Sequence, residues 1–150
     1  SPQDVFNRPQ NAEVARIVGM ESALEGRIVE ASAGLLSVDV SGTLLHALGR
    51  EESVGPDVFV CIRAEDVVLE KGEAGASSAR NRLRGTVRSV NTIGALARVE
   101  IDCGFPLSAV VTRPAVEDLH LVPGVEVTAF VKAGAVHLVP RYEAVASGAA

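Results

Sequence analysis

Aromatic residues and cysteines are scarce in this sequence, and tryptophan is absent. The chain has 150 residues, 3% of them aromatic, and its two cysteines form no CxxC pair. The core must therefore consist of Val, Leu, Ile and Ala, and we expect Cys61 and Cys103 to be free, buried thiols. No apolar run approaches the roughly 18 residues of a membrane span, and no signal peptide begins the sequence. We therefore expect a soluble, cytoplasmic protein.

Residue patterns typical of enzymes are also absent. His46, His120 and His137 follow no metal-binding spacing. Glu65 and Asp66 are adjacent carboxylates, but neighbouring residues on a strand face opposite sides and cannot act as one acid–base pair. The chain has no GxxxxGK[ST] loop, so it does not bind a nucleotide in that way. We expect a binding protein rather than an enzyme, with no cofactor and no metal.

Charge is distributed unevenly along the chain. The net charge of −5 disfavours a general nucleic-acid-binding protein. Residues 1–73 have a balance of −7, whereas residues 74–150 have a balance of +2, which together give the total of −5. The second half is therefore the part that suits an anionic partner.

Two long segments of this second half contain no acidic residue. One lies between Glu73 and Glu100 and has four arginines within nine positions; the other follows Glu126 and contains Lys132, one of two lysines in the chain. Each segment places a fixed cation beside small residues, and the first adds serine hydroxyls, a donor-only environment suited to a tetrahedral oxyanion. Alternatively, the arginines at alternate positions only solvate one face of a strand, and composition alone favours this second interpretation.

Short apolar runs separated by turn residues predict a protein made mostly of β-strands. Fourteen Gly and seven Pro are spread along the whole length. Helices are expected only over residues 9–19 and 114–121. Strands are expected over residues 24–29, 35–40, 43–48, 58–62, 67–69, 83–90, 96–101, 107–111, 125–131 and 136–139.

The two groups of five strands are related by an internal repeat. Residues 24–28 match residues 83–87 at an offset of 59, and residues 58–64 match residues 127–133 at an offset of 69. Five strands are enough to close a small barrel of the oligonucleotide/oligosaccharide-binding (OB) type. We predict an all-β fold of two tandem five-stranded OB-like barrels with a short N-terminal helix. The expected boundaries are 1–20 for the lead-in and helix, 21–72 for the first repeat, 73–142 for the second repeat and 143–150 for a disordered tail.

Several motifs resemble known families. The Ser-Ala-Arg-Asn-Arg-Leu-Arg-Gly-Thr-Val of residues 78–87, with residues 119–124 and the Val-Lys-Ala of residues 131–133, resembles the molybdate-binding molbindin (Mop) family. Residues 62–67 are similar to the related TOBE repeat of ABC-transporter ATPases. Residues 9–19 resemble the segment that follows the ATPase domain in those proteins.

The resemblance spans residues 4–142 and implies the regulatory domain of an ABC importer ATPase for molybdate or tungstate. It implies a homodimer at the cytoplasmic face of the membrane, joined to the ATPase domain of the same parent chain and through it to a membrane permease. Bound oxyanion would inhibit transport when the ligand is plentiful. The alternative is a ligand-free dimerisation scaffold in an importer for another substrate. The residues implied to contact the oxyanion are Ser78, Ala79, Arg80, Asn81, Thr112, Lys132, Ala133 and Gly134.

The sequence departs from the family pattern in both repeats. Gly134 and Ala115 stand where the family commonly has serine, and each change removes a hydroxyl donor. The first repeat lacks a Ser-Ala-Arg-Asn motif and has Glu65-Asp66 where the second has Gly134-Ala135. Because two carboxylates would repel a dianion, we expect the first repeat to be structural.

Overall fold

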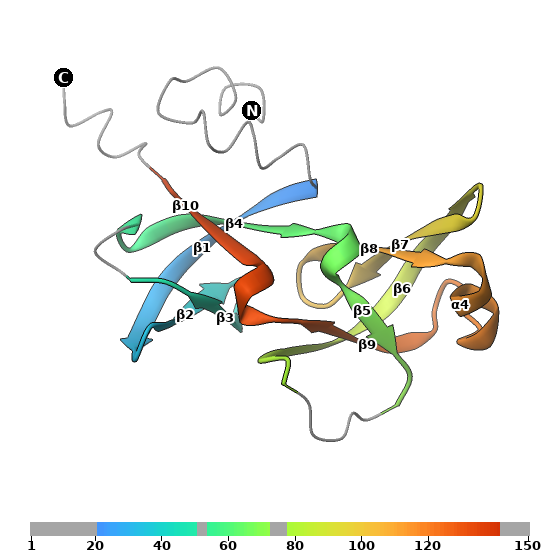
Figure 1. The fold of residues 1–150 in the computed structure, drawn as a ribbon, viewed down its shortest axis with the longest axis horizontal. Coiled ribbons are helices and arrows are strands. Elements are labelled where there is room, and N and C mark those ends of the chain that lie inside the picture. Colours follow the sequence, from blue (N-terminus) through green and yellow to red (C-terminus); the bar gives the residue numbers. More distant parts are fainter. Residues whose placement is uncertain (1–20, 51–53, 73–77, 142–150) are drawn as a thin grey trace, which may run out of the picture.

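The computed structural model of the protein describes residues 21–50, 54–72 and 78–141. Most of these residues belong to two curled five-stranded antiparallel sheets (Figure 1). The helix expected over residues 9–19 and the predicted tail lie outside the described residues. Within these ranges, no helix has the length and apolar character needed to cross a membrane.

The strands lie close to their predicted positions, so the all-β prediction is confirmed. Helix α4 (Arg113–Asp118) ends before residue 121, the predicted end, because His120 has a left-handed φ of 51°. The strands are β1 (Glu21–Ser32), β2 (Leu35–Val40), β3 (Thr43–Leu48), β4 (Asp57–Arg63), β5 (Val68–Glu70), β6 (Asn81–Ile93), β7 (Leu96–Asp102), β8 (Pro106–Thr112), β9 (Glu126–Val131) and β10 (Val136–Pro140).

The two repeats exchange their last strands. The strand order is β10-β4-β1-β2-β3 in one sheet and β5-β9-β6-β7-β8 in the other. Strand β5 of the first repeat therefore pairs with β9, and β10 of the second repeat pairs with β4 (Figure 1). The predicted boundaries assigned all five strands of the first barrel to residues 21–72. The structure differs because the chain crosses to the other sheet after β4 and again after β9.

Each crossing starts with a short 3-10 turn. Turn η2 (Ala64–Asp66) follows β4 and contacts β8, whereas η3 (Ala133–Ala135) follows β9 and contacts β3. Arg63 precedes η2 and Lys132 precedes η3, both in extended conformation. These two cations thus occupy equivalent positions in the repeats, where each chain segment leaves its own sheet.

Aliphatic side chains fill the core, as the composition predicts. Gly85 allows β6 and β7 to approach closely, since a Cβ there would lie 2.6 Å from Ile101 Cγ2 and 2.8 Å from the carbonyl oxygen of Asp102. Among the most deeply buried side chains, none more than 1% exposed, are Leu36, Leu45, Val58, Val60, Val99 and Ile101.

Both cysteines are free and buried, which confirms the sequence prediction. Burial raises the pKa of the Cys61 thiol to about 11, because the charged thiolate loses its hydration. Burial also raises the pKa of Cys103. Both side chains therefore stay neutral thiols near pH 7 and act as small apolar core residues.

Candidate functional site

Arg80 and Lys132 flank the end of the β6–β9 ladder. These strands are antiparallel, and their last pair is Asn81 with Val131. Arg80 directly precedes Asn81, and Lys132 directly follows Val131. Both side chains are exposed, whereas Asn81 and Val131 are buried, as expected when successive residues face opposite sides. Two exposed cations that are far apart in the sequence therefore adjoin the same end of the ladder.

The equivalent positions of the first repeat have opposite charges. There the β1–β4 ladder pairs Glu21 with Arg63. The repeat offsets make Glu21 the counterpart of Arg80 and Arg63 the counterpart of Lys132. At these positions the sequence of the second repeat has two cationic residues, whereas that of the first has one cationic and one acidic residue, and this difference in composition favours anion binding at the second repeat.

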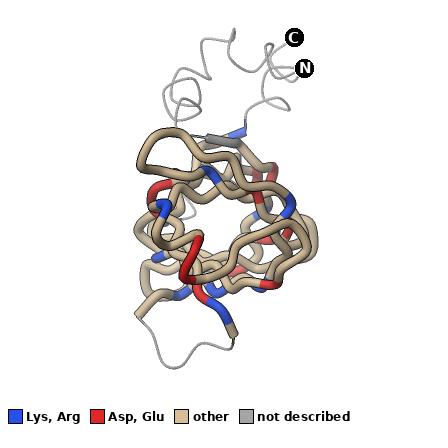
Figure 2. The backbone as a smooth tube through the Cα atoms, turned by 90° about the vertical axis from the view of Figure 1, so that its right-hand side faces the viewer, with Lys and Arg blue, Asp and Glu red and all other residues tan. Residues whose placement is uncertain are grey.

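Two other arginines of the cluster form ion pairs with carboxylates. Arg84 forms an ion pair with Glu126 at 3.6 Å, and Arg88 forms one with Asp102 at 3.5 Å. Basic and acidic residues are interspersed over the outside of the barrels (Figure 2). Exposed pairs of this kind contribute at most about 1 kcal/mol, and they mainly solvate the strand surface. Arg84 and Arg88 therefore fit the alternative interpretation, in which the arginines only solvate one face of a strand.

Asn81 holds the two sheets together. Its side chain is only 2% exposed, and its Oδ1 accepts a hydrogen bond from the backbone N–H of His46 at 2.7 Å. Its Nδ2 donates to the carbonyl oxygens of His46 at 2.9 Å and Val131 at 3.1 Å. Both amide hydrogens are therefore in use, so this side chain has no donor left for an anion. The resemblance implied a ligand contact, but here the amide fixes the segment that carries Arg80 to β3 of the other sheet.

Thr112 lies at the opposite end of the second sheet. It is paired with Leu96, beside the turn that joins β6 to β7, whereas Arg80 precedes the first residue of β6. The Thr112 hydroxyl accepts a hydrogen bond from the N–H of Ala115 at 3.3 Å and caps helix α4. Within one chain, the structure does not bring Thr112 together with Arg80 and Lys132.

The remaining predicted residues adjoin the two cations. Arg80 Nε donates to the carbonyl oxygen of Ser78 at 3.3 Å. Ala79 and Ala133 are buried, so their small side chains let the backbone pack closely beside the cations. A Cβ at Gly134 would lie 3.6 Å from Leu48 Cδ1, an ordinary contact distance. The space would therefore admit the serine that the family commonly has at this position.

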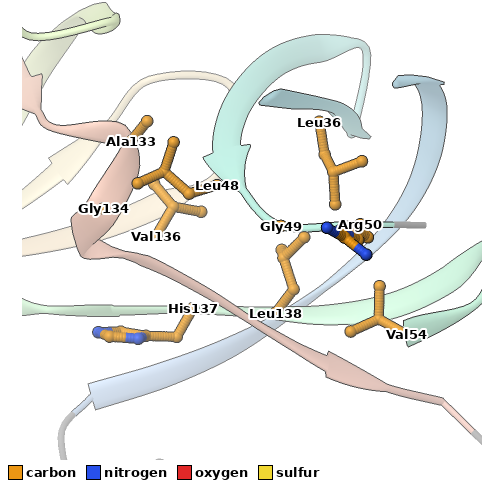
Figure 3. Close-up of a pocket in the computed structure, with 10 residues that line it drawn as sticks. All are labelled: Leu36, Leu48, Gly49, Arg50, Val54, Ala133, Gly134, Val136, His137 and Leu138. Carbon is orange, nitrogen blue, oxygen red and sulfur yellow. The ribbon is translucent and has the colours of Figure 1, made fainter. Parts of the chain in front are cut away.

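An open pocket of about 450 Å³ lies beside η3. Figure 3 shows Leu48 next to Ala133 and Gly134, at the edge of this pocket. The lining is mostly aliphatic, with Arg50 and His137 as its basic side chains. This pocket brings the end of β3 next to the segment that follows Lys132.

A second pocket, of about 480 Å³, shares Gly134 and His137 with the first and is lined by more charged residues. The sequence did not predict that Arg63 and Asp66 line this pocket, because no sequence pattern indicates the strand exchange that brings them to Lys132. The offset of 69, which makes Arg63 the counterpart of Lys132, was the one available indication. The second pocket is lined by Arg63, Asp66, Lys132, Gly134, Ala135 and His137.

The family model of the TOBE domain matches residues 77–138. This range includes β6, β9 and most of β10, together with Arg80 and Lys132. The chain contains a TOBE domain. This TOBE domain thus includes the Arg80 and Lys132 ends of strands β6 and β9. The family match covers the second repeat and most of β10, the strand of this repeat that pairs with β4 in the first sheet.

The TOBE-containing chain has named relatives among ABC importer ATPases. It is 37% identical over 139 residues to the molybdate/tungstate import ATP-binding protein WtpC of Pyrococcus horikoshii, and the match covers 92% of the chain and 38% of the relative. WtpC of Pyrococcus abyssi is 30% identical over 139 residues, with 89% and 37% covered. The chain therefore spans less than two fifths of the length of these relatives.

A solved structure confirms the fold. The cytoplasmic molybdate-binding protein ModG, in a form with molybdate bound, superposes with a TM-score of 0.68 and 29% sequence identity. The superposition covers 81% of this chain and 96% of the ModG chain. The two five-stranded sheets of the TOBE-containing chain thus form the tandem OB-like arrangement that the sequence predicted.

Proposed function

We propose that the chain is the regulatory domain of an ABC importer ATPase and binds one tetrahedral oxyanion, molybdate or tungstate, at Arg80 and Lys132. The observation that supports this proposal is the β6–β9 register, whose last pair, Asn81 with Val131, is flanked by Arg80 and Lys132. The relatives support the ligand class, since they are molybdate/tungstate import proteins and a molybdate-binding protein.

The chemistry of the site suits a dianion. The arginine guanidinium offers a planar fork of donors, and the lysine ammonium offers a compact charge, so together they match the two negative charges of the ligand. Ser78 contributes a hydroxyl donor beside them, and the small residues Ala79, Ala133 and Gly134 leave the backbone accessible. In this proposal Asn81 positions the site rather than contacting the ligand.

Titration calorimetry of the chain with molybdate, tungstate and sulfate tests the proposal. We expect molybdate and tungstate to bind with similar affinity, because their charge and shape are nearly the same, and the smaller sulfate to bind more weakly. At about 100 times its dissociation constant, the ligand should also stabilise the fold by roughly 2.7 kcal/mol. If none of the three anions gives a binding heat, the ligand-free dimerisation scaffold becomes the better account.

We further propose that the domain forms a homodimer at the cytoplasmic face of the membrane and that bound oxyanion inhibits transport. A ligand can shift the arrangement of two ATPase domains only through its different affinity for the two arrangements. In the complete transporter, saturating molybdate should lower ATPase and uptake activity, and Lys132→Ala should remove this response. Activity that is insensitive to molybdate would contradict inhibition, and a monomer in light scattering would contradict the homodimer.

A further inference from the structure

The second pocket, which is lined by Arg63, Asp66 and Lys132, lies where the two repeats exchange strands. Arg63 and Asp66 reach it from the first repeat, at the start and the end of turn η2. Lys132 and His137 reach it from the second repeat, before η3 and within β10. Two fixed cations, an imidazole and one carboxylate thus line a single space, although the sequence assigned Arg63 to a repeat without a ligand role.

The strand registers explain this grouping. Val136 of β10 pairs with Ile62 of β4, and the residues next to this pair, Ala135 and Arg63, both line the pocket. Val68 of β5 pairs with Phe130 of β9, and Asp66 and Lys132, each two residues from this pair, both line the pocket. Strand β9 lies between β5 and β6, so the strand that Lys132 follows is flanked by the strand after Asp66 and by the strand that Arg80 precedes.

We infer that Arg63 is a further oxyanion-binding residue and that Asp66 lowers the affinity of the same site. The inference rests on the proposed function, since it takes the anion to be bound at Lys132. The Arg63 guanidinium adds a positive charge and a fork of N–H donors to the pocket that Lys132 lines. The Asp66 carboxylate accepts hydrogen bonds but donates none, so it repels a dianion in this pocket.

Small residues leave room for the ligand between these groups. Gly134 and Ala135 form the wall of the pocket between Lys132 and His137. In the first repeat, the counterparts of Gly134 and Ala135 are Glu65 and Asp66. The carboxylate in the pocket, that of Asp66, therefore comes from the first repeat only. The site is therefore shared by the two repeats, and the first repeat sets its affinity.

The expected size of the Asp66 effect follows from Coulomb's law. A single charge about 7 Å from a dianion in water changes the dissociation constant about sevenfold at low salt, and about twofold at physiological ionic strength. The loss of a charged donor such as Arg63 is larger, about tenfold, because a hydrogen bond is lost together with the charge.

Calorimetry with molybdate at low and physiological salt tests the inference in the complete chain. Asp66→Asn, which keeps the side-chain shape, should tighten binding about two- to sevenfold, with the smaller gain at higher salt. Arg63→Gln should weaken binding about tenfold. If Arg63→Gln does not fold, Arg63→Lys replaces it, with a smaller loss of affinity expected because the charge is kept.

Matched controls separate local effects from a change of net charge. Glu126→Gln and Arg84→Gln make the same charge changes in an ion pair at the other end of the β9 ladder, and they should leave the dissociation constant unchanged. An unchanged dissociation constant in Asp66→Asn or in the Arg63 variant, while Lys132→Ala still weakens binding, overturns this inference and leaves the proposed function intact. Absence of molybdate binding by the unmodified chain overturns both.

Discussion

Replacing either Arg80 or Lys132 with alanine is expected to weaken molybdate binding about ten- to a hundredfold. Each substitution removes a charge-assisted partner of the dianion, which contributes about 1.5–3 kcal/mol. Because both side chains contact one ligand, the double variant should lose less than the two single losses combined. Titration calorimetry measures the three dissociation constants.

Arg84→Ala is the control for these two substitutions. Arg84 lies on the same strand face as Arg80, but its guanidinium pairs with Glu126, so its loss should change the affinity little. If Arg80→Ala and Lys132→Ala both retain the affinity of the unmodified chain, the oxyanion lies elsewhere and the pairing of these cations has no role in binding.

Asn81→Ala is expected to lower the free energy of unfolding by about 2–4 kcal/mol. The substitution leaves three backbone groups without their partner: the N–H and C=O of His46 and the C=O of Val131. Since Asn81 also fixes the segment before β6, oxyanion affinity should fall as well, although the side chain has no donor left for the ligand. Chemical denaturation gives the stability change, and calorimetry gives the affinity.

The control for Asn81→Ala is Asn91→Ala, an exposed asparagine of the same strand. It should change the free energy of unfolding by no more than about 0.5 kcal/mol, the usual limit for surface substitutions. Equal, small effects at the two positions would mean that the hydrogen bonds of Asn81 do not hold the sheets together.

The sequence predicts the strands well but not their partners. Alternating apolar residues between glycines and prolines decide which side chains face inward, and this pattern located the core of both sheets. It does not decide which neighbour a strand pairs with. Because β4 and β9 are similar in sequence, each offers an equivalent edge to the short apolar strands β5 and β10. The exchange of these strands therefore depends on the tertiary fold.

For the candidate site, too, the sequence indicated individual residues but not the contacts between them. The two acid-free segments pointed to Arg80 and Lys132, because a cation beside small residues, in a segment without Asp or Glu, can be recognised in the sequence itself. The role of Asn81 depends on His46 in the other sheet, and the position of Thr112 depends on the β7–β8 register. The grouping of Arg63 with Lys132 depends on the exchanged strands. These contacts join residues that the linear sequence gives no reason to connect.

The central claim is that one tetrahedral oxyanion is bound by Arg80 and Lys132. Diffraction at the molybdenum absorption edge, from crystals of the chain grown with molybdate, locates the metal directly. We expect an anomalous peak at which the oxyanion oxygens lie within hydrogen-bonding distance of the Arg80 guanidinium and the Lys132 ammonium. A peak away from both residues, or no peak at a molybdate concentration that saturates binding in calorimetry, would contradict it.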